Sequence, residues 1–70
     1  MSQVEKAIQL IRLSVVIEIT GLSKTGIYEA IKAGDFPGQV KINSRSSAWV
    51  RQEILDWVQS KIEARSQEVK

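Results

Sequence analysis

Two short segments with helical spacing of apolar residues lie close together in this chain, and their separation strongly limits the possible folds. The first segment covers residues 14–20. The second follows the N-cap candidate Ser23 and runs to about residue 33, so that only Gly21-Leu22-Ser23 separates the two helices. Ser14 and Ser23 are predicted to be N-caps, because a serine hydroxyl can accept a hydrogen bond from an amide of the first turn. Gly21 is predicted to end the first helix in the left-handed conformation. A short turn with glycine between two short helices indicates a helix-turn-helix.

Each of these helices is predicted to have one apolar face. The residues on the apolar faces are Val15, Val16 and Ile19 in the first helix and Ile27, Ala30 and Ile31 in the second. At about 100° per residue, the opposite side of the second helix carries Thr25, Tyr28, Glu29 and Lys32, with Lys24 at its leading edge. This side is therefore polar, as expected for a helix that enters the major groove of DNA.

A short hairpin is predicted to follow the two helices. Phe36-Pro37 gives an apolar anchor and a rigid turn after Gly34. Val40 and Ile42, and then Trp49, are apolar positions of two short strands that are joined by a polar loop at 43–47. A polar hairpin directly after a helix-turn-helix is typical of a wing.

Residues from Arg51 onward are predicted to form a third helix that packs over the first two and frays after Ala64. Trp57 lies beside the apolar stripe of this helix. The residues of the stripe are Ile54, Leu55, Val58 and Ile62. The predicted fold class is therefore mainly α with a small β-hairpin, in a single winged helix-turn-helix domain.

The N-terminal residues 2–10 have a weaker helical pattern, and a short extended piece is predicted at residues 11–13. The apolar positions of this pattern are Val4, Ala7, Ile8 and Ile11. Chain ends fray unless they are docked, so the helix is expected to be marginal, and its apolar side either supports self-association or docks on the domain. The predicted organisation is an N-terminal extension over 1–10, one domain over 11–64 and a frayed C-terminus over 65–70.

Length and composition exclude several classes of protein. A chain of 70 residues has room for one small domain, and the absence of Cys and His excludes a disulfide-stapled fold and a Cys/His zinc module. The longest apolar run, Val15-Val16-Ile17, is too short to cross a membrane, and Met1–Lys6 lack the apolar region of a signal peptide. The chain also lacks a Gly-rich phosphate loop. We therefore expect a soluble, cytoplasmic domain without enzymatic activity, metal, cofactor or small-molecule substrate.

The distribution of charge is more informative than its total. The formal net charge is only +2, which is too small to indicate a nucleic-acid partner by itself. Residues 36–52, however, contain Lys41, Arg45 and Arg51 and no acidic residue, whereas residues 53–63 are acidic on balance. A basic stripe of this kind is typical of a phosphate-binding surface, and a solvated polar loop is the alternative interpretation.

The candidate DNA-binding residues are polar or basic side chains of the second helix and the hairpin. They are Ser23, Lys24, Thr25, Tyr28, Lys32, Lys41, Ser44, Arg45 and Ser46. Lysines pair with phosphates, and hydroxyl groups donate to phosphate oxygens, as do the free amides at a helix start. Thr25 or Lys24 is the candidate for a base edge, and Arg45 is the best single candidate for a phosphate or minor-groove contact. On any amphipathic helix, however, such residues also form an ordinary solvated face.

Four other residues have two interpretations each. Glu29 repels phosphates unless it accepts from a cytosine amino group or neutralises a neighbouring lysine. Gly26 either permits close approach to DNA or close packing of the two helices, and packing is favoured. Trp49 and Trp57 are expected to be core anchors rather than platforms for base stacking.

The ordered combination of motifs over residues 11–60 resembles the AlpA-like phage regulatory proteins. The shared pieces are Arg12-Leu13, Thr20-Gly21-Leu22-Ser23-Lys24, Ile27-Tyr28, Gly34-Asp35-Phe36-Pro37, Val40-Lys41, Arg45 with Trp49, and Glu53-Ile54-Leu55-Asp56-Trp57-Val58. The resemblance implies a MerR-like, excisionase-like winged helix-turn-helix that binds DNA for a prophage or integrative element. Carried over by position, Ser23, Lys24, Thr25 and Tyr28 begin the recognition helix, and Arg45 lies in the wing. Gly26 and Glu29 depart from the family pattern, which more usually has Ser or Thr and a basic residue there.

Three functions are compatible with these features. The first is a sequence-specific transcriptional regulator that binds double-stranded DNA and self-associates on adjacent sites. The second is an excisionase-type factor that bends attachment-site DNA. The third is a protein-interaction module that binds an integrase, a repressor or RNA polymerase, a hypothesis that the weak net charge and Glu29 support.

Overall fold

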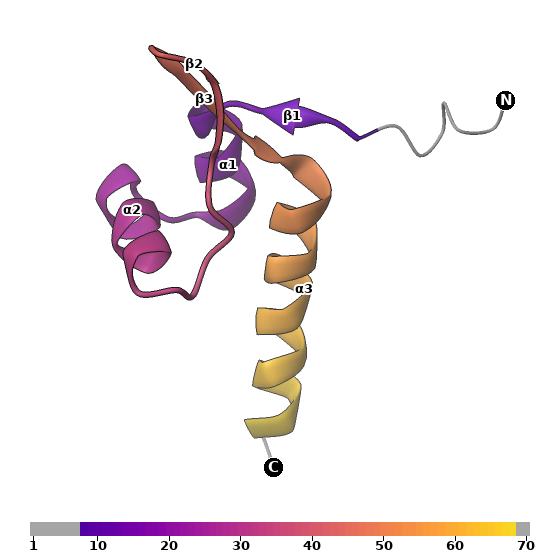
Figure 1. The fold of residues 1–70 in the computed structure, drawn as a ribbon. Coiled ribbons are helices and arrows are strands. Elements are labelled where there is room, and N and C mark those ends of the chain that lie inside the picture. The colour runs from indigo at the N-terminus through magenta and orange to yellow at the C-terminus, as the bar shows by residue number, and fades with distance from the viewer. Residues whose placement is uncertain (1–7, 69–70) are drawn as a thin grey trace, which may run out of the picture.

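Three helices and three strands make up residues 8–68, the part of the chain that the computed structural model describes (Figure 1). In chain order they are β1 (Leu10–Ile11), α1 (Leu13–Thr20), α2 (Lys24–Lys32), β2 (Val40–Asn43), β3 (Ser46–Val50) and α3 (Arg51–Glu68). The strands form one antiparallel sheet in the order β1-β3-β2. The helix-turn-helix of α1 and α2, followed by the β2–β3 hairpin and α3, confirms the predicted winged helix-like fold.

The turn between α1 and α2 has the predicted chemistry. Gly21 has a φ of 77° and donates its N–H to the Ile17 carbonyl oxygen at 2.8 Å. The Ser23 Oγ accepts from the N–H of Gly26 at 3.0 Å and so caps α2. In addition, the Thr20 Oγ1 accepts from the N–H of Leu22 at 3.2 Å. These bonds use local polar groups to fix the angle at which the chain enters α2.

The predicted N-cap at Ser14 is wrong. α1 begins at Leu13, its N-cap is Arg12, and no side-chain bond caps this end. Arg12 is extended, with a φ of −85° and a ψ of 168°, because it directly follows β1, whose Ile11 pairs with Trp49. The start of α1 is therefore set by strand pairing with a distant segment rather than by a local serine.

The β2–β3 hairpin has a shorter loop than residues 43–47. Only Ser44 and Arg45 form the turn, and the Asn43 Oδ1 accepts from the Arg45 N–H at 2.9 Å. The paired residues are Val40 with Ala48, Lys41 with Ser47, and Asn43 with Ser46, with a register shift between Lys41 and Asn43. The polar residues at 46 and 47 belong to β3 because they pair with Asn43 and Lys41 of β2.

The central core cluster draws one residue from each of five parts of the fold, and Ala48 of β3 is buried as well. Val16 of α1, Ile27 of α2, Phe36 of the following loop, Trp49 of β3 and Ile54 of α3 are all buried. Trp49 and Phe36 are thus core residues, as predicted. The core joins both helices of the helix-turn-helix to the sheet and to α3, and it therefore holds α2 at a fixed orientation.

One predicted core residue on α1 is exposed. Val15 has 36% of its surface accessible, whereas Val16 is fully buried. Leu13, Ile17 and Ile19 pack against the core. The inward face of α1 is centred on Val16, and Val15 lies about 100° away from it on the helix, so this prediction was wrong.

The two ends of the chain differ from their predicted structure. Residues 8 and 9 are not helical, and Leu10 belongs to β1, so the N-terminal helix is wrong for this part; its residues 2–7 lie outside the described residues. At the other end, α3 continues past Ala64 to Glu68. Figure 1 shows α3 extending beyond the other elements. No helix in the described range is long and apolar enough to cross a membrane.

Candidate nucleic-acid interface

The outward side of α2 carries the polar residues that its sequence pattern predicts. Ile27 is fully buried on the inner side, while Lys24, Thr25 and Lys32 are exposed. Together with Tyr28 and Glu29, these three line an open hollow of about 520 Å³. The fold thus leaves a free helical face with two ammonium groups and a hydroxyl group, which are suitable donors to phosphate and base atoms.

Tyr28 lies at the margin of this face rather than fully in solvent. Its side chain is half-buried and packs against the core. The Tyr28 and Trp49 rings are in edge contact, with centroids 6.1 Å apart and planes at 60°. The expectation that Tyr28 projects freely with Thr25 is therefore only partly met, because its ring also joins α2 to β3.

Ser23 combines a structural role with donor capacity. Its hydroxyl oxygen accepts from the Gly26 N–H, and the hydroxyl hydrogen remains able to donate to an anion. A Cβ on Gly26 would lie 3.3 Å from the Ser23 Oγ and 3.9 Å from the Leu22 Cβ. The tight contact at Gly26 is thus within the turn, and the favoured interpretation of close packing between the two helices is not supported.

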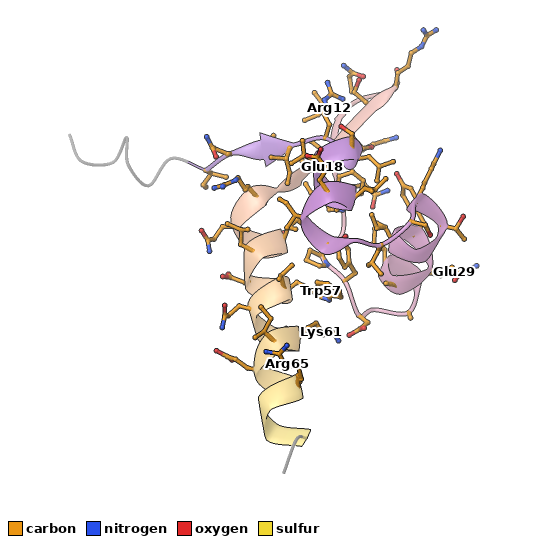
Figure 2. All side chains as sticks on the ribbon, turned by 180° about the vertical axis from the view of Figure 1, so that it is seen from behind. Arg12, Glu18, Glu29, Trp57, Lys61 and Arg65 are labelled. Carbon is orange, nitrogen blue, oxygen red and sulfur yellow. The ribbon has the colours of Figure 1, made fainter. Side chains whose placement is uncertain are left out.

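Glu29 is exposed on the same helix and, within residues 8–68, forms no ion pair with Lys32 or Lys24. Figure 2 shows Glu29 pointing outward from α2. The hypothesis that it neutralises a neighbouring lysine is therefore wrong for this conformation. An unpaired carboxylate at this position offsets part of the positive charge that Lys24 and Lys32 give to this face.

The hairpin supplies a second group of basic residues. Lys41 in β2 and Arg45 in the turn are exposed, as is Ser44, whereas Ser46 is half-buried in β3. In the described part of the chain, Arg45 has no acidic partner. Both figures place the hairpin tip and α2 on the side of the molecule away from the C-terminal part of α3.

Arg12 is a further basic residue that sequence reasoning did not assign to the site. Its Nη1 donates to the Ser47 carbonyl oxygen at 3.5 Å, although the two residues are 35 positions apart. The side chain is exposed and so adds a guanidinium beside Ser47, close to the turn of the hairpin. No local signal could have placed it there, because its position depends on the pairing of β1 with β3.

The family model of the prophage CP4-57 regulatory protein (AlpA) matches residues 9–62. The chain belongs to this family. The matched range begins just before β1 and ends within α3, so it includes α2 and the whole hairpin. The AlpA family is a regulatory family of phages and prophages, not a family of enzymes.

A protein of Enterobacteria phage P4, described as uncharacterized protein ORF88, is similar to this AlpA-family chain. The two are 35% identical over 57 residues, which cover 81% of this chain and 65% of the phage protein. This chain therefore spans slightly less than two thirds of that relative's length. The likeness supports the assignment to a phage regulatory family.

The AlpA fold brings most of the predicted site residues to the surface of two elements. Ser23, Lys24, Thr25 and Lys32 are exposed on or beside α2, and Lys41, Ser44 and Arg45 are exposed on the hairpin. Tyr28 and Ser46 are half-buried at the margins of these groups. The geometry therefore exposes these basic and hydroxyl-bearing side chains on one helical face and one hairpin.

Proposed function

We propose that this AlpA-family chain is a sequence-specific DNA-binding protein that regulates transcription of a phage or prophage. α2 lies in the major groove of double-stranded DNA, and the β2–β3 hairpin contacts the flanking backbone or the minor groove. The protein acts in the cytoplasm and needs no cofactor for this role. The observation that carries the proposal is the free polar face of α2, on which Lys24, Thr25 and Lys32 are exposed while Ile27 on the opposite side is fully buried.

Contacts to phosphates set the position of the protein on the duplex. Lys24 and Lys32 pair with phosphates from α2, and the Ser23 hydroxyl group donates at the start of this helix. The hairpin residues in the proposed contact are Lys41, Ser44, Arg45 and Ser46. Arg45 carries the largest part because it is exposed at the tip without an acidic partner in the described residues.

Contacts to base edges come from the first turns of α2. Thr25 is exposed one residue after the helix begins, where a recognition helix approaches the groove. The Tyr28 ring rests against Trp49, which restricts the positions that the phenol can reach. Thr25 therefore reads a base with its hydroxyl or methyl group, and Tyr28 contributes a donor of nearly fixed position.

The proposal is tested by selection of bound duplexes from a random pool, followed by titration of the recovered duplex at several salt concentrations. Lys24, Lys32, Lys41 and Arg45 neutralise about four phosphates, so log K is expected to fall against log salt with a slope of about −4. Failure to recover a common motif, or a slope near zero, contradicts the proposal. A flat slope favours instead an interaction with a protein such as an integrase or RNA polymerase.

The genomic position of the recovered motif then decides how DNA binding is used. A motif within a promoter supports control of transcription. A motif within an attachment region assigns the same contacts to an excisionase-type role, in which several copies bend DNA for recombination.

A pair of arginine variants tests the contact of the hairpin with DNA. Arg45→Ala is the test variant and Arg65→Ala on α3 is its matched control, because both remove one exposed guanidinium.

A further inference from the structure

The two outer strands of the sheet each have one edge that pairs with no other strand of residues 8–68. β1 and β2 flank β3, and β2 is exposed along its whole length. An unpaired edge offers backbone N–H and C=O groups to another strand. Each of these two edges therefore has the capacity to accept a strand from a second molecule.

Exposed apolar side chains gather at these two edges. Ile8 is 78% exposed and Leu10 is 47% exposed, and both lie on the β1 side. Val40 is 37% exposed and Ile42 is 45% exposed, and both lie in β2. Most of the large apolar residues that the described chain leaves exposed thus lie beside an open sheet edge, where burial against another strand removes them from water.

The strand register places one residue of each group, Leu10 and Val40, on the same face of the sheet. Leu10 pairs with Val50, and Val40 pairs with Ala48. Because alternate residues of a strand share a face, Leu10 and Val40 lie on the same side, opposite the buried Trp49. The Arg51 N–H donates to the Gln9 carbonyl oxygen at 2.8 Å, which continues the β1 ladder towards Ile8.

We propose that β1 of one molecule pairs with β2 of a second copy of this chain, so that the sheet continues from molecule to molecule. Leu10 and Val40 lie on the same face, so the joined sheet keeps one unbroken apolar stripe across the junction. A β1-to-β2 contact uses two different surfaces, and it therefore allows a chain of copies rather than a closed pair. The inference goes beyond the proposed DNA contact and does not depend on it.

Three features make this contact weak for a free molecule. β1 has only two residues, and β2 carries Lys41 and a register shift, both of which hinder edge-to-edge pairing. The contact is therefore expected at high protein concentration or where copies are held close together. Adjacent sites on DNA provide such a place. One module of this size buries only about 600–1,000 Å² on DNA, so several copies on neighbouring sites are needed for useful affinity.

Crosslinking through introduced cysteines tests the proposal without DNA. The chain has no cysteine, so Leu10→Cys and Val40→Cys each give one reactive position. An equimolar mixture of the two variants is oxidised at high concentration, and the disulfide-linked dimers are counted by mass spectrometry. The mixed dimer, which joins one copy of each variant, is expected to exceed the share that random collision gives.

Val15→Cys is the matched control, because Val15 is 36% exposed and lies on α1 rather than in a strand of the sheet. Mixtures that contain it are expected to give the random share. A yield of mixed dimer equal to the random share for Leu10→Cys with Val40→Cys overturns the proposal. A predominance of the Val40→Cys homodimer also overturns it, because that outcome indicates two-fold pairing of β2. Circular dichroism of each variant verifies that it is folded.

Sedimentation of neutral variants gives a second measurement. Val40→Thr keeps a β-branched residue in the strand but removes apolar surface, and it is expected to weaken self-association about two- to fivefold, as for the loss of one cross-strand apolar pair. Val15→Thr is expected to leave self-association unchanged. Equal effects of the two variants, or no self-association of the unchanged chain, overturn the proposal.

Discussion

The indole Nε1 of Trp57 donates a 2.6 Å hydrogen bond to the carbonyl oxygen of Asp35, which joins α3 to the loop after α2. The Lys61 Nζ lies 3.4 Å from the Asp35 Oδ2 and 5.3 Å from the centre of the Trp57 ring. Phe36 packs edge-on against Trp57 with centroids 4.8 Å apart. The Asp35 N–H in turn donates to the carbonyl oxygen of Ala30 in α2. This cluster therefore helps to fix α2 relative to α3, as Figure 2 illustrates for Trp57 and Lys61.

Substitutions of Trp57 are expected to separate the hydrogen bond from the packing. Trp57→Ala removes both and is expected to lower the free energy of unfolding by about 3–5 kcal/mol. Trp57→Phe retains an aromatic ring next to Phe36 but removes the donor to Asp35, and it is expected to cost about 1 kcal/mol through the lost bond. Urea unfolding measures both. Stability of Trp57→Ala equal to that of the unchanged chain would show that the cluster does not support the fold.

The hydrogen bond of Trp57 also illustrates which features the sequence could predict. Gly21 and Ser23 were predicted correctly, because their roles depend on neighbours within the same turn. The Trp57–Asp35 contact and the contact of Arg12 with Ser47 join residues that are 22 and 35 positions apart. Periodicity and capping preferences contain no information about such pairs.

The same distinction applies to the candidate site. The exposed face of α2 followed directly from helical geometry, so Lys24, Thr25 and Lys32 were placed correctly on the surface. Helical geometry left open whether Tyr28 projects or covers the edge of the domain, since its partial burial depends on where the side chain of Trp49 enters the core. Sequence pattern thus located the face of the helix, and tertiary packing decided how far one of its residues projects.

Trp49 is the residue on which the core depends most. It is 1% exposed, and its Nε1 has no hydrogen-bond partner in the described residues. Trp49→Ala is expected to lower the free energy of unfolding by about 3–5 kcal/mol, enough to unfold a domain of this size. Trp49→Phe is expected to cost less, because it retains a ring and removes a buried N–H that lacks a partner. Thermal melts compare the two, and a cooperative melt of Trp49→Ala at the original temperature would contradict this placement of the core.

Lys24→Ala and Arg45→Ala are expected to weaken binding to all DNA sequences by similar factors, with little effect on folding. Both side chains are exposed, and each variant removes one contact to phosphate, so the magnitude of the salt slope should fall by about 0.9. Fluorescence anisotropy with the selected duplex and with an unrelated duplex measures the effect. Arg65→Ala on α3 is the control and should leave the slope unchanged. Unaltered binding by both variants would remove α2 and the hairpin from the interface.

Thr25→Ala and Tyr28→Phe are expected to change the preference among sequences more than the salt slope. Each removes a neutral hydroxyl group, and Tyr28→Phe preserves the ring that contacts Trp49. A good contact with a base contributes about 1–3 kcal/mol of discrimination, so the ratio of specific to unspecific affinity should fall by roughly tenfold or more for a residue that reads a base. Competition with duplexes that differ at single positions measures this ratio. A loss that is equal for all duplexes would instead assign the hydroxyl group to a phosphate contact.

Glu29→Gln is expected to strengthen DNA binding, because it removes an exposed carboxylate that has no ion-pair partner within residues 8–68. The gain should apply to unrelated duplexes as well and should diminish as salt is raised, as expected for relief of repulsion from phosphates. Glu18→Gln on α1 removes an exposed carboxylate from the other helix and serves as the control. If Glu29 instead accepts from a cytosine amino group, Glu29→Gln weakens binding to the selected duplex alone. Titrations of both duplexes at two salt concentrations therefore distinguish repulsion from base recognition.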